Sequence, residues 1–133
     1  MARLILDTGI LIAASRGRLA DSDVGVGDDV AVPAIVVAEY LNGVLLARDP
    51  EAAARQRRFL DNLLAQAPAV DYTVEVAAHH AELLAHCRRT GTPRGAHDLI
   101  IAACARASGR TLLSRDQRAR WADLPGVDVR LVG

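Results

Sequence analysis

A chain of 133 residues, of which 51% are hydrophobic, is long enough to bury one core and too apolar to stay disordered. No apolar run approaches the roughly 20 residues of a membrane-spanning helix, and Asp7 comes too early for the apolar region of a signal peptide. The formal charge is zero and all sixteen cationic residues are arginine, which excludes chemistry that needs a catalytic lysine. We therefore expect a cytoplasmic protein without a membrane segment.

Short apolar runs alternate with longer helical patterns along the chain. In chain order we expect a strand over 3–6, a helix over 9–14 capped by Thr8, a loop over 16–28, a strand over 30–32 ended by Pro33, and helices over 34–48 and 50–67. The second half predicts a strand over 69–72, a helix from its cap Thr73 to about Thr90 with Gly91 as its stop, a helix over 96–108 stopped by Gly109, and strands over 111–113 and 127–132.

This alternation predicts one α/β domain over residues 1–133, with a central, mostly parallel five-stranded sheet flanked by helices. Ligands of such sheets bind beyond the carboxyl ends of the strands. Asp7 directly follows the first expected strand, and Asp116 follows the fourth after only two residues. Both acids are therefore expected at the same edge of the sheet.

Four acids stand in segments where burial is expected. Asp7 is the only charged residue from Leu4 to Ser15, Glu39 interrupts an apolar helix, and Asp98 begins another. Taken singly, each has an ordinary explanation as a helix cap, a solvated side chain, a first-turn acid or, for Asp116, a turn residue. Buried carboxylates are costly without a partner, however, and two strand-end acids with two helix acids would converge on one cluster.

Four carboxylates that meet at one place would repel one another unless cations neutralise them. Ligand sets made only of oxygen suit Mg²⁺ or Mn²⁺ rather than zinc. Two such ions can activate a water and stabilise the leaving oxygen in phosphodiester cleavage. The pattern therefore predicts metal-dependent phosphoryl chemistry carried by Asp7, Glu39, Asp98 and Asp116.

The motifs around these acids resemble those of PIN-domain proteins, in particular VapC-type ribonuclease toxins. They are Leu4-Ile5-Leu6-Asp7-Thr8-Gly9, Val36-Val37-Ala38-Glu39-Tyr40, His97-Asp98-Leu99-Ile100-Ile101-Ala102-Ala103 and Thr111-Leu112-Leu113-Ser114-Arg115-Asp116. The match runs in order along essentially the whole chain. The resemblance implies an Mg²⁺- or Mn²⁺-dependent endoribonuclease, neutralised by a VapB-like antitoxin, that forms a homodimer and a toxin–antitoxin hetero-oligomer.

The resemblance also implies roles for individual side chains. By their positions in these motifs, Asp7, Glu39, Asp98 and Asp116 would bind the metal. Thr8 and Ser114 would be supporting hydroxyls. The fourth acid is the least certain, because family members often place an aromatic residue shortly after it. Here the nearest aromatic is Trp121, five residues on, and Asp123 is a substitute if the turn is drawn differently.

Arginines are candidates for holding the RNA backbone, because residues 86–120 carry eight arginines and only two acids. Arg94, Arg115, Arg118 and Arg120 flank the expected pocket in sequence, and a solvated role is the alternative for each.

Other metal-binding patterns are weak. Three histidines, at 79, 80 and 86, share one expected helix, but no Cys or His elsewhere pairs with them. His97 adjoins Asp98 but is expected to face another way and to make a structural or substrate-side hydrogen bond. Cys87 and Cys104 are isolated in apolar segments and are expected to be buried.

Two other functional classes are phosphotransfer enzymes and non-catalytic binding modules. Phosphotransfer enzymes on similar sheets also place an acid after the first strand, but receiver domains need a lysine, which this chain lacks. Haloacid-dehalogenase-type phosphatases need a second acid where this chain has Gly9. The remaining alternative is a non-catalytic PIN-like module that binds RNA or protein, and it differs from a nuclease in producing no new RNA ends.

Overall fold

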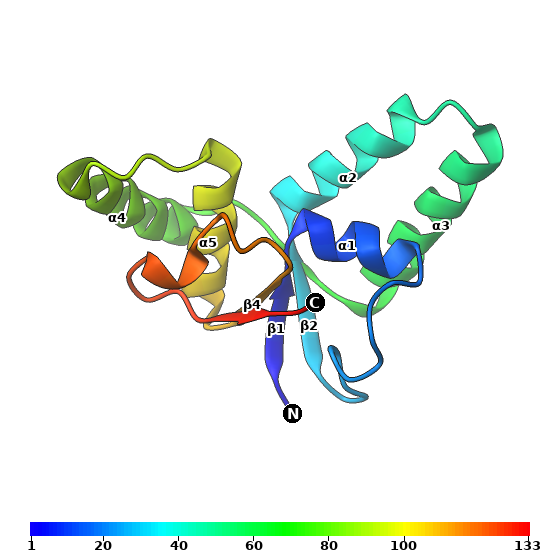
Figure 1. Ribbon diagram of the computed structural model, residues 1–133, viewed down its shortest axis with the longest axis horizontal. Helices are drawn as coiled ribbons and strands as arrows, with labels where there is room; N and C mark the ends of the chain where they lie inside the picture. Colours follow the sequence, from blue (N-terminus) through cyan, green and yellow to red (C-terminus); the bar gives the residue numbers. More distant parts are fainter.

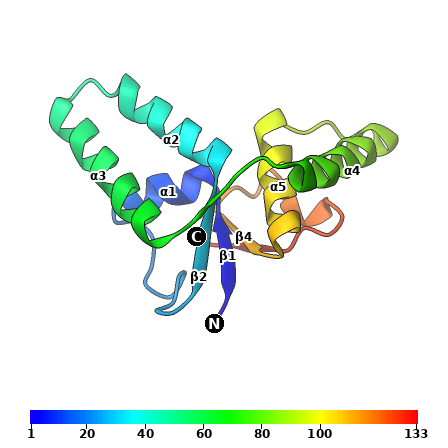
Figure 2. The same cartoon turned by 180° about the vertical axis from the view of Figure 1, so that it is seen from behind.

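The computed structural model describes residues 1–133 and places five strands in one sheet (Figures 1 and 2). All neighbouring strands are parallel, in the spatial order β3-β2-β1-β4-β5. The strands are β1 (Arg3–Leu6), β2 (Asp29–Pro33), β3 (Ala69–Val70), β4 (Thr111–Ser114) and β5 (Val129–Leu131). The expected five-stranded α/β fold is confirmed, and the sheet is entirely rather than mostly parallel.

Strand β1 lies at the centre of the sheet, between β2 and β4. Its residues Leu4 and Ile5 are completely buried, as expected for a continuous apolar run in a strand that is covered on both faces. Leu6 pairs with Leu113 of β4 in parallel register. The carboxyl ends of these two central strands therefore finish side by side.

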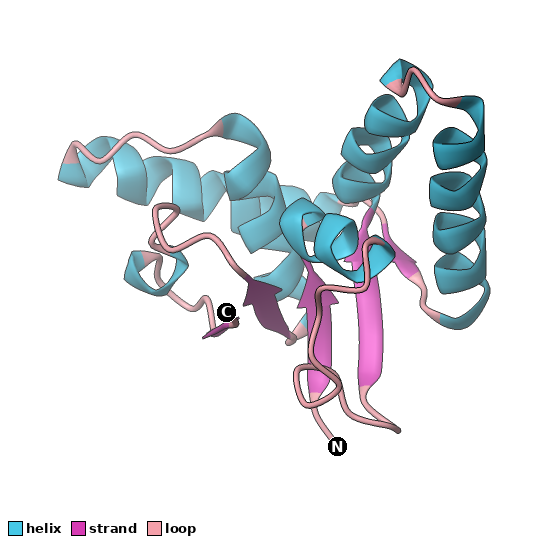
Figure 3. Ribbon diagram, turned by 45° about the vertical axis from the view of Figure 1, so that its right-hand side comes forward, coloured by secondary structure: helices cyan, strands magenta, loops and turns pink.

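The helices divide into two groups around the carboxyl edge of the sheet. They are α1 (Thr8–Ser15), α2 (Ala34–Leu46), α3 (Pro50–Gln66), α4 (Val74–Thr90) and α5 (Ala96–Ser108), and a short 3₁₀ helix, η1, spans Trp121–Asp123. Figure 1 shows α2 and α3 as a hairpin on one side and α4 with α5 on the other, and Figure 3 shows the same arrangement from a second direction. The ends of β1 and β4 therefore lie between the two groups.

Side-chain caps fix the start of three helices. Asp49 caps α3 and Thr73 caps α4, the latter as expected. Thr8 was expected to cap the first helix, and this prediction is wrong. Asp7 has the extended backbone of a cap and its side chain accepts the N–H of Ile10, so Thr8 becomes the first residue of α1.

The remaining boundaries are close to those expected. Gly91 and Gly109 end α4 and α5 with left-handed backbones, at φ 64° and 63°, a conformation that glycine adopts without steric cost. Cys87 and Cys104 are buried free thiols, and burial raises the pKa of Cys104 to about 11. A thiol of this kind behaves as an inert apolar group. Of the helices described, not one combines the length and apolarity that crossing a membrane requires.

Candidate metal centre

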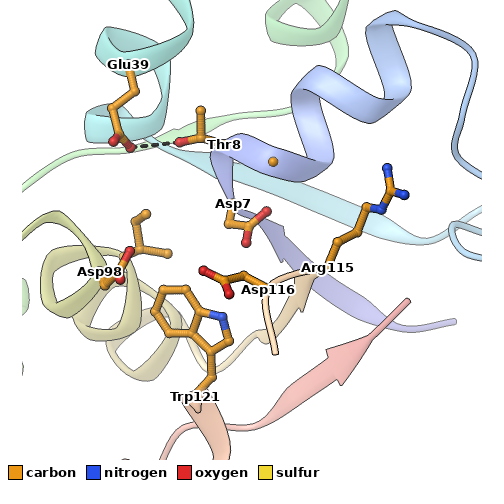
Figure 4. Close-up of a pocket in the computed structure, with 9 residues that line it drawn as sticks. Asp7, Thr8, Glu39, Asp98, Arg115, Asp116 and Trp121 are labelled. Atoms are coloured by element: carbon orange, nitrogen blue, oxygen red, sulfur yellow. Dashed lines mark hydrogen bonds between the residues drawn. The ribbon is translucent and has the colours of Figure 1, made fainter. Parts of the chain in front are cut away.

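A pocket of about 320 Å³ lies at the carboxyl edge of the sheet. All four acids selected from the sequence line it, each from a different part of the chain: Asp7 after β1, Glu39 on α2, Asp98 on α5 and Asp116 after β4. Figure 4 shows their side chains arranged around one common space. The other lining residues are Thr8, Gly9, Ile101, Arg115 and Trp121. The fold thus gathers acids that are up to 109 positions apart, as the difference between 116 and 7 shows.

Asp7 is the one buried acid of the four, at 6% exposure. Its Oδ1 accepts the N–H of Ile10 at 2.9 Å, and its Oδ2 accepts the hydroxyl of Ser114 at 2.5 Å. Burial raises the pKa of the Asp7 carboxyl, the two hydrogen bonds lower it, and the nearby charges of Asp116 and Glu39 raise it further. A carboxylate oxygen has a second lone pair, so Asp7 is fixed in orientation and still free to bind a cation.

Glu39 is held by two neighbours from different elements. The hydroxyl of Thr8 donates to its Oε1 at 2.7 Å, as the dashed line in Figure 4 marks. The Nδ1 atom of His97 lies 3.1 Å from its Oε2. The hydrogen-bond partner of His97 is therefore one of the other acids and not the adjacent Asp98.

Asp116, rather than Asp123, is the fourth acid at the pocket. Its Oδ1 accepts the backbone N–H groups of Arg118 and Ala119, which shapes the turn after β4. Asp123 does not line the pocket, and its exposed carboxylate faces two arginines, at 3.8 Å from Arg120 and 4.0 Å from Arg94. The alternative drawing of the turn is therefore not the one the chain adopts.

The acids affect one another electrostatically. Burial raises the pKa of the Asp98 carboxyl, and the charges of Asp116, Glu39 and Asp7 raise it further, against a smaller lowering by His97. No hydrogen bond contributes to this shift. Asp98 is therefore a carboxylate whose ionised form is disfavoured by the protein around it.

The donor set fits a hard divalent cation. Every acidic ligand offers oxygen, as Mg²⁺ and Mn²⁺ prefer, and a cation would offset both the burial and the smaller carboxylate repulsion that raise the pKa values of Asp7 and Asp98. No three acidic, histidine or cysteine side chains stand close enough to enclose an ion in their present positions. Hydrogen bonds with Thr8 and His97 hold the Glu39 carboxylate in its present position.

Substituting Asp98 by asparagine should stabilise the metal-free protein at pH 7, because burial and the neighbouring carboxylates disfavour the charge that asparagine lacks. A carboxyl with a raised folded-state pKa favours folding when protonated, and this contribution is lost as pH rises from the unfolded value of 3.8 through the raised value. The advantage of Asp98→Asn in chemical denaturation should therefore vanish near pH 3.8. With Mg²⁺ present, the wild type should gain more stability than the variant, and equal gains would contradict a role for Asp98 in binding.

The arginines expected near RNA have different positions. Arg115 lines the pocket, and Arg118 is exposed beside it in sequence. The side chain of Arg94 is only 9% exposed, and its guanidinium donates to the backbone carbonyls of Ala119 and Arg120. The phosphate-binding role expected for Arg94 is therefore corrected. Its guanidinium is hydrogen-bonded to the backbone of the loop after β4 and stabilises that loop.

One of the three histidines on α4 has a hydrogen-bond partner that precedes the helix. The Nδ1 atom of His80 is 2.8 Å from the hydroxyl of Tyr72, and no group of three potential ligands that includes His79 or His86 is close enough to hold an ion.

One residue of the site was missed as a participant. Trp121 is 2% exposed, lines the pocket, and donates its Nε1–H to the hydroxyl of Ser114 at 3.0 Å. From the sequence, Trp121 stands out only because it lies five residues after Asp116, farther than the aromatic residue of family members. The available signal was its being the sole tryptophan of a chain with 3% aromatics.

A parallel α/β domain with four acids at the carboxyl edge of its sheet defines a class of protein suited to binding cations through carboxylate oxygens. A comparison with known families identifies which one: residues 4–125 match the PIN domain. The chain belongs to the PIN-domain family, and the resemblance seen in its motifs is confirmed.

Relatives and solved structures agree with this assignment. The chain is 30% identical over 122 residues to ribonuclease VapC2 of Haemophilus influenzae, covering 89% of each protein. It is 28% identical over 102 residues to ribonuclease VapC of Rickettsia bellii, covering 77% of this chain and 76% of the relative. The fold matches VapBC2 of Rickettsia felis, bound to a promoter DNA fragment, with a TM-score of 0.84 at 21% identity over 98% of each chain. It matches VapBC-5 of Mycobacterium tuberculosis with a TM-score of 0.81 at 25% identity, over 99% of this chain and 100% of the other.

Proposed function

We propose that this protein is an Mg²⁺- or Mn²⁺-dependent endoribonuclease and the toxin of a toxin–antitoxin pair. The observation that carries the proposal is the convergence of Asp7, Glu39, Asp98 and Asp116 on one pocket at the carboxyl edge of the sheet. Its support from relatives is that matched proteins are ribonucleases named VapC and that matched structures are VapBC complexes.

The four acids would hold the cation, and neighbouring groups orient them. Ser114 donates to Asp7 and Thr8 donates to Glu39, so two of the four carboxylates are turned in defined directions before any ligand arrives. When bound, the metal would supply water activation and stabilisation of the negative charge that develops at the phosphate. The bases that line the pocket are carboxylates; the one histidine beside them, His97, is hydrogen-bonded to Glu39, and the chain has no lysine.

The pocket wall also carries one cation. Arg115 lines the same space as the acids, and its Nη2 atom donates to the carbonyl oxygen of Gly133 at 3.2 Å. A guanidinium has five N–H donors and this hydrogen bond uses one of them, so Arg115 retains donors for a phosphate oxygen. We infer that Arg115 contacts the RNA backbone next to the cleaved bond.

Removing the two arginines beside the pocket should weaken RNA binding mainly at low salt. In an Arg115→Ala/Arg118→Ala variant with catalysis blocked, we expect the slope of log Kd against log salt to fall by about 1 to 2, because each phosphate contact releases bound counterions. Filter binding at several salt concentrations measures this slope. The matched control is Arg88→Ala/Arg89→Ala, which removes two exposed arginines from the far end of α4; an equal fall in both variants would show that only net charge matters.

The proposed partners are a VapB-like antitoxin and a second copy of the chain. Leu45 and Leu46 at the end of α2 are 81% and 72% exposed, and adjacent exposed leucines are characteristic of contact surfaces. We expect light scattering at micromolar concentration to give the mass of a dimer. A monomeric mass over that range would contradict the homodimer.

Cleavage of total cellular RNA by the purified, antitoxin-free protein tests the proposal. Discrete fragments should form with Mg²⁺ or Mn²⁺, disappear with chelator, and be absent for Asp98→Asn. Fragments that persist in chelator would contradict metal dependence. If a folded protein binds RNA but yields no new ends with either metal, across transfer, ribosomal and messenger RNA, the chain is instead a binding module.

A further inference from the structure

The hydroxyl of Ser114 is a junction of three hydrogen bonds beneath the pocket. Ser114 is completely buried. Its Oγ lies 2.5 Å from Asp7 Oδ2, 3.0 Å from the backbone nitrogen of Asp116 and 3.0 Å from Trp121 Nε1. Two of the four pocket acids therefore meet the indole of Trp121 through one oxygen atom.

The chemistry of the partners fixes the direction of each bond. A hydroxyl has one hydrogen to donate and two lone pairs that accept. The indole N–H of Trp121 and the backbone N–H of Asp116 are donors only, so they occupy both lone pairs. The single hydrogen of Ser114 is then left for Asp7, which as a carboxylate only accepts. The Trp121 indole and the Asp116 backbone N–H together leave the Ser114 proton directed at Asp7.

The loop after β4 holds the indole in this place. Trp121 follows Arg120, a residue with a left-handed backbone at φ 46°, which costs a non-glycine residue about 1 kcal/mol or more. The guanidinium of Arg94 donates to the carbonyls of Ala119 and Arg120. The strained backbone at Arg120 is stabilised by hydrogen bonds from Arg94, and the adjacent Trp121 is only 2% exposed. These contacts indicate that the surrounding residues hold the indole in its position.

We propose that Trp121 is a positioning residue for the acidic centre, acting through Ser114 to hold the Asp7 carboxylate in its metal-binding orientation. This inference rests on the proposed function, because it assigns Asp7 to the cation. The positioning depends on the N–H of the indole. An aromatic ring without an N–H at this position would fill the same space and leave one lone pair of Ser114 free. The hydroxyl would then gain a second orientation, and Asp7 would lose its fixed partner for part of the time.

An isosteric exchange separates the hydrogen bond from packing. Trp121 is the only tryptophan, so growth of a tryptophan auxotroph on benzothienylalanine replaces it alone, with sulfur in place of the indole N–H and the bicyclic shape kept. The probe is Mn²⁺ itself, titrated by calorimetry into the full-length protein. Steady-state cleavage gives kcat and KM separately, and melting in chelator reports folding.

The exchange is made in the wild type and in Ser114→Ala, as a double-mutant cycle. In the wild type we expect Mn²⁺ to bind about tenfold more weakly, the scale of changes around a metal ligand's supporting shell, with kcat lowered and KM for RNA within about twofold. In Ser114→Ala the same exchange should change Mn²⁺ affinity by less than about twofold. Equal weakening in both backgrounds, or none in the wild type, would overturn the positioning role.

The outcome also distinguishes this inference from the proposed function. An unmodified protein that binds no Mn²⁺ contradicts both, whereas one that binds Mn²⁺ and cleaves RNA, but is indifferent to the sulfur exchange, contradicts the positioning role alone. If the exchanged protein does not fold, the positioning role is tested on the unmodified protein through its single indole N–H signal in the NMR spectrum. Mg²⁺ should shift this signal in the wild type and shift it by less than half as much in Ser114→Ala; equal shifts would overturn the positioning role.

Discussion

Asp7→Asn should lower RNA cleavage at saturating Mg²⁺ by about a thousandfold, the scale seen when a single charge-stabilising group is removed from an active site. The substitution keeps the shape of the side chain and an oxygen that accepts the N–H of Ile10, so α1 retains its cap. It removes the negative charge from the one buried acid of the pocket. Initial cleavage rates of a defined RNA, measured over a range of Mg²⁺ concentrations, give the size of the loss.

Asp49→Asn is the matched control for this variant. Asp49 caps α3 in the same way, with its side chain accepting the N–H of Glu51 at 3.0 Å, but it is exposed and does not line the pocket. We expect cleavage by Asp49→Asn to stay within about twofold of the wild type, in line with surface substitutions that change little. Similar losses in both variants would show that helix capping, and not the carboxylate at the pocket, explains the effect of Asp7.

Arg94→Met should destabilise the protein by about 3 kcal/mol and lower its activity as well. The guanidinium is almost buried and donates to two backbone carbonyls, those of Ala119 and Arg120. Hydrogen bonds from a charged donor are each worth roughly 1.5 to 3 kcal/mol, although the Arg120 carbonyl keeps the backbone N–H of Asp123 as a second donor. Methionine fills a similar volume, so the change removes the donors rather than the packing.

Chemical denaturation in chelator measures the stability of this variant without any metal contribution. Arg120→Met is its control, because Arg120 is 60% exposed and its 3.8 Å approach to Asp123 is a surface contact, which is worth less than about 1 kcal/mol. Stability of Arg94→Met within about 0.5 kcal/mol of the wild type would contradict the fastening role that the structure gives to this arginine.

The position of the acidic pocket followed from local sequence patterns. Leu4, Ile5 and Leu6 form an apolar run that ends at Asp7, and this pattern alone predicts an acid at the carboxyl end of a buried strand. Glu39 could be selected because it is the one charge in an apolar helix, and Asp98 because it is the one acid at the start of another largely apolar helix. The fold and these placements are therefore the most predictable part of the molecule, although the metal-binding role of the acids stays a prediction.

The error at the first helix has a simple cause. Aspartate and threonine are both good helix caps and stand next to each other here, so composition does not decide between Asp7 and Thr8. The structure decides it through a long-range contact: Thr8 lies in α1, where its hydroxyl donates to Glu39, 31 residues away. A one-residue shift of the cap is what makes Thr8 part of the pocket.

The contacts of the loop after β4 could not be read from the sequence. Arg94 reaches the carbonyl of Arg120 across 26 residues, and Trp121 returns to Ser114 across seven. No periodic pattern marks such contacts, because they depend on how the loop folds back over the sheet. For the same reason Arg94 was assigned to RNA rather than to the protein interior, and the hydrogen bond of Trp121 was not foreseen.

The central claim is that four carboxylates assemble a divalent-cation site at the carboxyl edge of the sheet. Crystals grown with Mn²⁺, with diffraction recorded at the manganese absorption edge, test it most directly. The account predicts anomalous density among Asp7, Glu39, Asp98 and Asp116, with side-chain rotations that bring their oxygens to the ion and competition by Mg²⁺. An empty pocket at saturating Mn²⁺, or density confined to another site such as the histidines of α4, would contradict it.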